Sequence, residues 1–109
     1  MNNGAITGRT KIGGFGGAVK STKAVDSCNT GAIGLAAYNG SNQGIGGLFG
    51  EMGYGSTLTR CYNTGAVTGD CYVGGLVGSV GSGSDATNGP SYIVDSYNSG
   101  SITGHSDKN

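Results

Sequence analysis

The sequence is poor in several kinds of residue that mark particular classes of protein. It holds one Pro and no Trp among 109 residues, and only 11 % of its residues are charged. A collagen-like chain needs abundant proline, so that class is excluded. Lys and Arg together number 6, as do Asp and Glu, so there is no cationic excess of the kind that releases counterions from nucleic acid. No apolar run approaches the ~18–20 residues that span a bilayer, and the first residues lack a cationic start and an apolar stretch. We therefore expect no nucleic-acid partner, no membrane span and no signal peptide.

Residues that could hold a metal or perform catalysis are also scarce. The three cysteines, Cys28, Cys61 and Cys71, are odd in number and form no C-x-x-C pair, which disfavours a zinc site. We expect them to be small buried residues rather than a disulfide pair. The lone His105 lies in a terminal tail, 105–109, where no second group could orient it. The sequence predicts no catalytic residue, no metal and no cofactor, and hence no enzyme.

Two glycine-rich segments resemble ligand-binding loops of three kinds, and each departs from the motif. Residues 81–86 fit G-x-G-x-x-A, but no helix follows to hold a pyrophosphate. The same segment resembles one calcium-binding nonapeptide, although such sites need tandem copies. Residues 14–21 resemble a phosphate loop with Val19 at the second glycine position. We interpret the first segment as a surface loop and the glycines of the second as part of a repeat.

Glycine is what the chain has in abundance, at 25 of 109 residues. Without a period, such a composition is typical of low-complexity chains. Here the glycines recur in phrases. The first phrase, in its clearest copy Asn63-Thr64-Gly65-Ala66-Val67-Thr68-Gly69, occurs four times, and its Asn positions are 27, 34 and 35 residues apart. A period of this size is typical of a solenoid.

Two further phrases occur three times each. One is apolar-Gly-Gly-apolar, at 12–17, 45–50 and 73–78; the other precedes the Asn, at 24–28, 58–62 and 93–97. Short Val-, Ile-, Tyr- and Thr-containing pieces bounded by Gly or Asn predict strands, whereas each glycine would destabilise a helix by about 1 kcal/mol. We predict an all-β fold without helix: a short parallel β-solenoid of about three coils, with three short strands per coil. One domain would cover 1–104, with repeat units of about 2–28, 29–62 and 63–97 and a partial unit 98–104.

Equivalent residues of successive coils would lie above one another in ladders. The predicted ladders are Ile6, Ile33, Val67 and Ile102; Ile12, Ile45 and Val73; Phe15, Leu48 and Leu76; and Asn29, Asn63 and Asn98. Two apolar residues three apart cannot both face inward on a regular strand, so we expect a bend or bulge at each Gly-Gly pair. The asparagines are expected at a turn that Asn can enter in left-handed geometry, with amide hydrogen bonds along the stack.

Two further columns should accompany these ladders. Tyr62 and Tyr97 align just before the asparagines, with Cys28 in the same place one coil earlier. Asp26 and Asp95 align with Arg60, which suggests an Asp–Arg–Asp stack on a solvated face, where ion pairs are weak. Unequal spacing places insertions at 36–44 and 79–92, and insertions in solenoids map to surface loops.

The phrases Gly74-Gly75-Leu76-Val77-Gly78 and Cys61-Tyr62-Asn63-Thr64-Gly65-Ala66-Val67-Thr68-Gly69 resemble the GLUG-motif repeat. The resemblance runs from Asn2 to Gly104. That motif recurs in bacterial cell-surface proteins, including adhesin-like proteins and the non-catalytic regions of IgA-specific metallopeptidases. The resemblance implies an extracellular or cell-surface, solenoid-like stretch of a larger protein without catalytic residues.

The function this favours is a non-catalytic structural or adhesive module that presents a rigid surface to a protein or glycan partner. Tyr38, Tyr54 and Tyr92, in or beside the inserted loops, are candidate contacts, since tyrosine supplies contact area at low entropic cost. Further repeats or end-to-end self-association are also compatible with exposed strand edges. The alternative is an accessory fragment of a surface peptidase or polysaccharide-degrading enzyme. An ice-binding solenoid is disfavoured, because Gly34 interrupts the rank of Thr7, Thr68 and Thr103.

Overall fold

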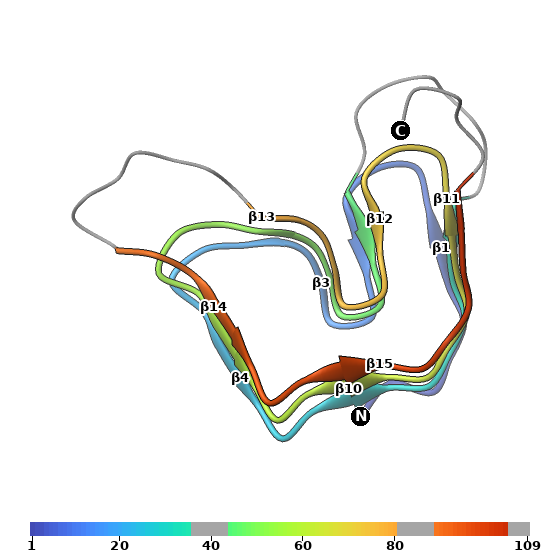
Figure 1. Ribbon diagram of the computed structural model, residues 1–109. Helices are drawn as coiled ribbons and strands as arrows, with labels where there is room; N and C mark the ends of the chain where they lie inside the picture. The colour runs from blue at the N-terminus through green and yellow to red at the C-terminus, as the bar shows by residue number, and fades with distance from the viewer. Residues whose placement is uncertain (36–43, 81–88, 105–109) are drawn as a thin grey trace.

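The chain folds as a short parallel β-solenoid, which confirms the predicted fold class (Figure 1). The structure is a computed structural model, and it describes residues 1–35, 44–80 and 89–104. Within these ranges there are sixteen short strands and no helix. Every strand pairing is parallel and joins equivalent positions of successive coils. The predicted loop 81–86, Tyr38 and the tail 105–109 lie outside the described residues.

In the described parts of the chain, the strands form five stacked sheets, so a full coil has five short strands where three were expected. The first coil contains β1 (Ile6–Gly8), β2 (Ile12–Gly13), β3 (Gly16–Val19) and β4 (Lys23–Val25). The second contains β5 (Cys28–Asn29), β6 (Ile33–Leu35), β7 (Ile45–Gly46), β8 (Phe49–Met52) and β9 (Thr57–Thr59). The third contains β10 (Tyr62–Asn63), β11 (Val67–Gly69), β12 (Val73–Gly74), β13 (Val77–Val80) and β14 (Tyr92–Val94). The chain then adds β15 (Tyr97–Asn98) and β16 (Ile102–Gly104).

Each additional strand arises where one sequence phrase is divided by a bend. The apolar-Gly-Gly-apolar phrase supplies two strands, because the first ends at the first glycine and the chain bends at the second, as at Gly47. The phrase before the asparagine is likewise divided at a residue with left-handed backbone. That residue is Asp26, Arg60 or Asp95, with φ of 51°, 51° and 49°. A left-handed residue breaks the extended geometry that a strand needs.

The register of the stack follows the repeated phrases. Paired positions include Ile6–Ile33–Val67–Ile102, Ile12–Ile45–Val73 and Asn29–Asn63–Asn98. Phe15, Leu48 and Leu76 each directly precede the paired residues Gly16, Phe49 and Val77. The residues of each predicted ladder therefore occupy equivalent positions of successive coils, but Phe15 and Ile102, in the first and last layers, are exposed rather than interior.

The interior is divided into two lobes, visible as the two halves of the cross-section in Figure 1. One core contains Ile12, Ile33, Ile45 and Val67, with Ile6 and Val73 packed against it. The other contains Leu48, Phe49, Met52, Leu58 and Cys61, with Leu76 among its half-buried neighbours. Ile45 and Leu48, three residues apart, both face inward, but into different lobes. The bend at Gly47 between them makes this possible.

The lobes meet at a waist, where the second glycine of each pair lies against an asparagine of the ladder. A Cβ atom on Gly47 would lie 2.4 Å from Cγ of Asn63 and 2.2 Å from the carbonyl oxygen of Gly75. Gly14 and Gly75 meet Asn29 and Asn98 in the same way. Real Cβ atoms do not approach other atoms so closely, so these positions require glycine. We call these contacts the glycine–asparagine waist.

The asparagines form a continuous hydrogen-bonded ladder through the waist. Asn29 and Asn63 are fully buried. The Nδ2 group of Asn63 donates to Oδ1 of Asn98 at 2.7 Å and to the carbonyl oxygen of Gly65 at 2.9 Å. Asn29 donates to Asn63 at 2.7 Å, and Asn2 donates to Asn29 at 2.6 Å. The predicted amide ladder is confirmed, but the left-handed residues of this region are Asp26, Arg60 and Asp95 rather than the asparagines.

Candidate ligand-contact surface

The outer side of the sheet formed by β5, β10 and β15 carries three columns of different chemistry. Asn29, Asn63 and Asn98 face inward from these strands, so the residues before and after them face outward. We call this surface the tyrosine face. Its members are Asp26, Arg60 and Asp95; Cys28, Tyr62 and Tyr97; and Thr30, Thr64 and Ser99.

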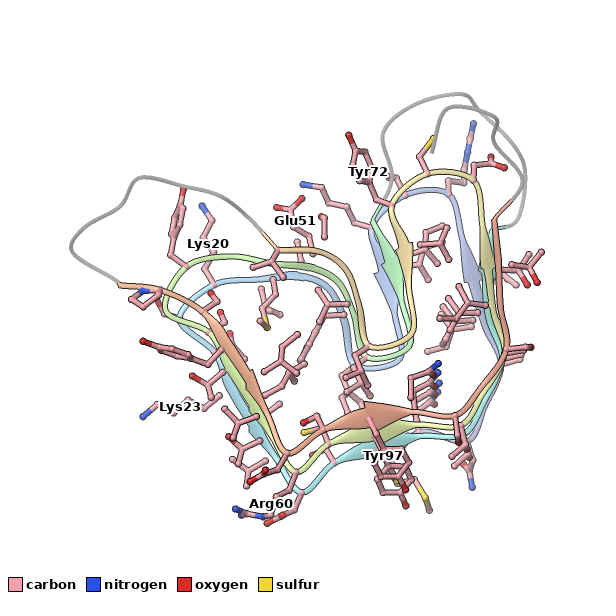
Figure 2. All side chains as sticks on the ribbon, viewed as in Figure 1. Lys20, Lys23, Glu51, Arg60, Tyr72 and Tyr97 are labelled. Atoms are coloured by element: carbon pink, nitrogen blue, oxygen red, sulfur yellow. The ribbon has the colours of Figure 1, made fainter. Side chains whose placement is uncertain are left out.

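The central column is an aromatic stack. The rings of Tyr62 and Tyr97 lie 5.2 Å apart between centroids and 5° from parallel. Figure 2 shows Tyr97 projecting away from the ribbon, and 56 % of its surface is exposed. Below Tyr62 lies Cys28, whose hydrogen bond raises the pKa of the Tyr62 phenol. Parallel pairing of the strands beneath holds both rings in register, so the stack is a preformed aromatic surface.

The charged column confirms the Asp–Arg–Asp stack. Arg60 donates from Nε to Oδ1 of Asp26 at 2.6 Å and from Nη2 to Oδ2 at 3.0 Å, a two-pronged contact. Hydrogen bonding from Arg60 lowers the pKa of Asp26. The same contact raises the pKa of Arg60, and the negative charge of Asp95 in the next coil raises it further. In Figure 2, Arg60 lies at the corner of the coil, to the left of Tyr97.

The pH dependence of this pair gives a test. Because the pKa of Asp26 is lowered in the folded chain, its stabilisation is present above the ordinary carboxyl pKa and is lost as pH falls through the lowered value. We expect Asp26→Asn to decrease the midpoint of urea unfolding slightly at neutral pH. In acid, the midpoints of the variant and of the parent chain should converge. Urea titrations followed by circular dichroism from neutral to strongly acidic pH measure this. Arg60→Gln should give the same convergence, and a gap that persists in acid would show that the ion pair is not its cause.

The third column supplies hydroxyl groups. Thr30, Thr64 and Ser99 are all exposed and follow the asparagines directly. Their backbone amides bond to the coil below, for example Thr64 N–H to the carbonyl oxygen of Asn29 at 2.9 Å. The backbone positions that carry these hydroxyls are therefore held in a row beside the tyrosine column. Aromatic area between charged and hydroxyl-bearing columns can contact a ligand that has both apolar and polar groups.

The tyrosines named from sequence lie elsewhere. Tyr92 is exposed on β14, and Tyr54 is half-buried, with the Lys20 ammonium 5.7 Å above its ring centroid. Neither belongs to the tyrosine face. Sequence reasoning treated Tyr62 and Tyr97 as ladder residues only. Their alignment outside the asparagine column was the signal that could have identified them as a surface pair.

The cysteines and other candidate metal ligands are placed as follows. Cys28, Cys61 and Cys71 are free and buried. The thiol of Cys61 lies 3.4 Å from the carbonyl oxygens of Ala24 and Thr59. Across residues 1–35, 44–80 and 89–104, no three His, Cys, Asp or Glu side chains come together as metal ligands would. The same ranges contain no helix of the length and apolarity that a membrane crossing requires.

Comparison with known proteins gives no match to a family model, to a curated protein or to a solved structure.

Proposed function

We propose that the chain is a non-catalytic adhesive and structural repeat module of a secreted or surface-attached bacterial protein, and that its tyrosine face contacts a neutral glycan. The observation that supports the glycan contact is the parallel Tyr62–Tyr97 stack between a charged and a hydroxyl column. The bacterial and extracellular setting follows from the resemblance of the repeated phrases to the GLUG motif.

A pyranose ring matches this surface in its general chemistry. It presents an apolar C–H face, which packs on an aromatic ring, and a rim of hydroxyls, which exchange hydrogen bonds with side chains such as Arg60, Asp95 and Ser99. The stack leaves open the ring face of Tyr97 that points away from Tyr62, and tyrosine has few rotatable bonds, so little entropy is lost when that face is covered. Because Asp26 already neutralises Arg60, the face has no excess of positive charge to select an anionic sugar.

Substitution of the exposed ring tests the proposal. Tyr97→Ala removes the open surface of the stack, and the minority of contact residues whose truncation costs more than ~1 kcal/mol is enriched in Trp, Tyr and Arg. We expect about a tenfold loss of affinity, equivalent to about 1.4 kcal/mol. A printed array of neutral and anionic pyranose oligosaccharides would identify bound sugars, and titration against the immobilised chain would give the affinities.

The matched control is Tyr92→Ala, which removes an equally exposed tyrosine from a different sheet. It should leave the affinity unchanged. Absence of binding at every spot, binding restricted to anionic sugars, or an equal loss in both variants would overturn the proposal. Circular dichroism of both variants separates loss of binding from loss of fold.

A further inference from the structure

The C-terminal end of the stack exposes side chains that the middle coil buries. Ile93 on β14 is 44 % exposed, whereas its partner Leu58 on β9 is fully buried. Ile102 on β16 is 48 % exposed, whereas its partner Val67 on β11 is fully buried. Val73, Leu76 and Val77 at this end are only half-buried. A further layer of chain would cover these ladder positions, since their equivalents one coil below are covered.

This end is stepped rather than flat. In the described parts of the chain, the sheet β1-β6-β11-β16 has four strands, whereas the sheets that end in β12, β13 and β14 have three. The segment 98–104 therefore stands one coil above its surroundings. We call the uncovered edges of β12, β13 and β14 the open shelf. A second copy cannot simply stack on top, because its flat first coil would rest on 98–104 and leave the shelf empty.

The step disappears if segment 98–104 takes the place of the first segment of another copy. Residues 98–104 and 2–8 are two copies of one phrase, Asn-x-Gly-x-Ile-Thr-Gly. Both occupy the same sheet: β1 pairs with β6 through Ile6–Ile33, and β16 pairs with β11 through Ile102–Val67. One edge of β16 is thus hydrogen-bonded to β11 of its own chain. Because β16 repeats the sequence of β1, its other edge is suited to pair with β6 of a second copy.

The polar ladder fits the same exchange. Asn2 donates from Nδ2 to Oδ1 of Asn29 at 2.6 Å. Asn98 ends the ladder and has the same orientation, since its Nδ2 donates to the carbonyl oxygen of Gly100 at 2.9 Å, as that of Asn2 does to Gly4. An Asn98 in place of the Asn2 of another copy would repeat the bond to Asn29. The exchange therefore replaces each hydrogen bond it breaks with one of the same kind.

We propose that this chain associates with itself head to tail. Residues 12–25 of an upper copy cover the open shelf of a lower copy. Residues 98–104 of the lower copy take the place of residues 2–8 of the upper copy. The bonds of the exchanged segment balance, so the net gain comes from the shelf, as apolar burial and as backbone hydrogen bonds to the uncovered edges of β12, β13 and β14. Continued register would place Phe15 of the covering copy, 37 % exposed in the single chain, over Leu76. Such an interface joins different surfaces of the two copies and does not close on itself, so it produces linear chains of molecules.

Sedimentation velocity of the full chain over a range of concentrations tests the association. We expect oligomers that grow with concentration, and at least a tenfold weaker association for Ile102→Lys. This side chain is exposed in the single copy but would be enclosed between Val67 and the Ile33 of the other copy. Thr103→Lys changes the adjacent, outward-facing residue and should associate as the parent chain does. Ile93→Lys is a second probe, on the shelf itself, should Ile102→Lys disturb folding.

A fourth variant distinguishes exchange from simple stacking. Ile6→Ser weakens the half-buried strand β1, which must be displaced in the exchange, and should strengthen association several-fold. A decrease would contradict the replacement of residues 2–8. A chain that stays monomeric at all concentrations, or equal association of Ile102→Lys and Thr103→Lys, would overturn the proposal. The measurement contains no sugar, so its outcome is independent of the proposed function.

Discussion

Gly47→Ala is expected to lower the free energy of unfolding by at least about 3 kcal/mol, the upper end of the usual range for overpacked cores. The added methyl group would lie 2.2 Å from the carbonyl oxygen of Gly75 and 2.4 Å from Cγ of Asn63. Neither atom can move away, because the carbonyl oxygen belongs to the backbone and the Asn63 side chain is held in the amide ladder. The whole free energy of unfolding of a small domain is only about 5–15 kcal/mol. Gly47→Ala should therefore remove much of the chain's stability. Urea unfolding followed by circular dichroism measures the change.

The matched control is Gly34→Ala. Among the residues that the structure describes, a Cβ atom at Gly34 would meet only the carbonyl oxygen of Thr68, at an ordinary 3.8 Å. Its effect on stability should be small and favourable, because alanine has less conformational freedom to lose than glycine. Equal losses in the two variants would show that glycine is needed for general flexibility rather than for the waist.

Asn63→Ala is expected to destabilise the chain by about 3 kcal/mol, because buried polar partners left unsatisfied lose about 1–3 kcal/mol each. The substitution removes the acceptor of the Asn29 amide and the donor to Gly65. It also interrupts the contact between Asn63 and Asn98 at 2.7 Å. Unlike a surface change, it leaves these groups buried where water cannot replace the missing bonds.

The same urea titration measures this loss, with Thr64→Ala as the control. Thr64 is the next residue, exposed on the tyrosine face, and surface substitutions usually change stability by no more than ~0.5 kcal/mol. A loss below about 1 kcal/mol for Asn63→Ala would show that the amide ladder contributes little net free energy.

The repeated phrases were sufficient to predict the register of the stack. Ile6, Ile33, Val67 and Ile102 recur at one place in the phrase, and in-register stacking follows from their equivalence. The cross-section could not be predicted in this way. The waist depends on Gly47 approaching Asn63, a contact between two different phrases. Sequence period alone says nothing about which sides of a coil touch.

The predicted strand count was wrong, and the tyrosine face was not predicted, each for a local reason. The corner at Asp26, Arg60 and Asp95 has left-handed backbone without glycine, so no residue type marked it as a break. Tyr54 and Tyr92 are predicted contacts because they lie near insertions. The aromatic pair that actually stacks, Tyr62 and Tyr97, belongs to the regular part of the repeat, where an aligned residue is easily interpreted as structural.

The glycine–asparagine waist has a consequence for changes in chain length. From Gly47 to Asn63 the path around one lobe takes 16 residues, and from Gly75 to Asn98 it takes 23, yet both pairs meet in the same way. Each coil thus recovers its alignment at the waist, although the second path is seven residues longer than the first. A foreign peptide could be grafted between Val80 and Gly89 without shifting the frame of the coils on either side, so the scaffold is suited to displaying variable loops.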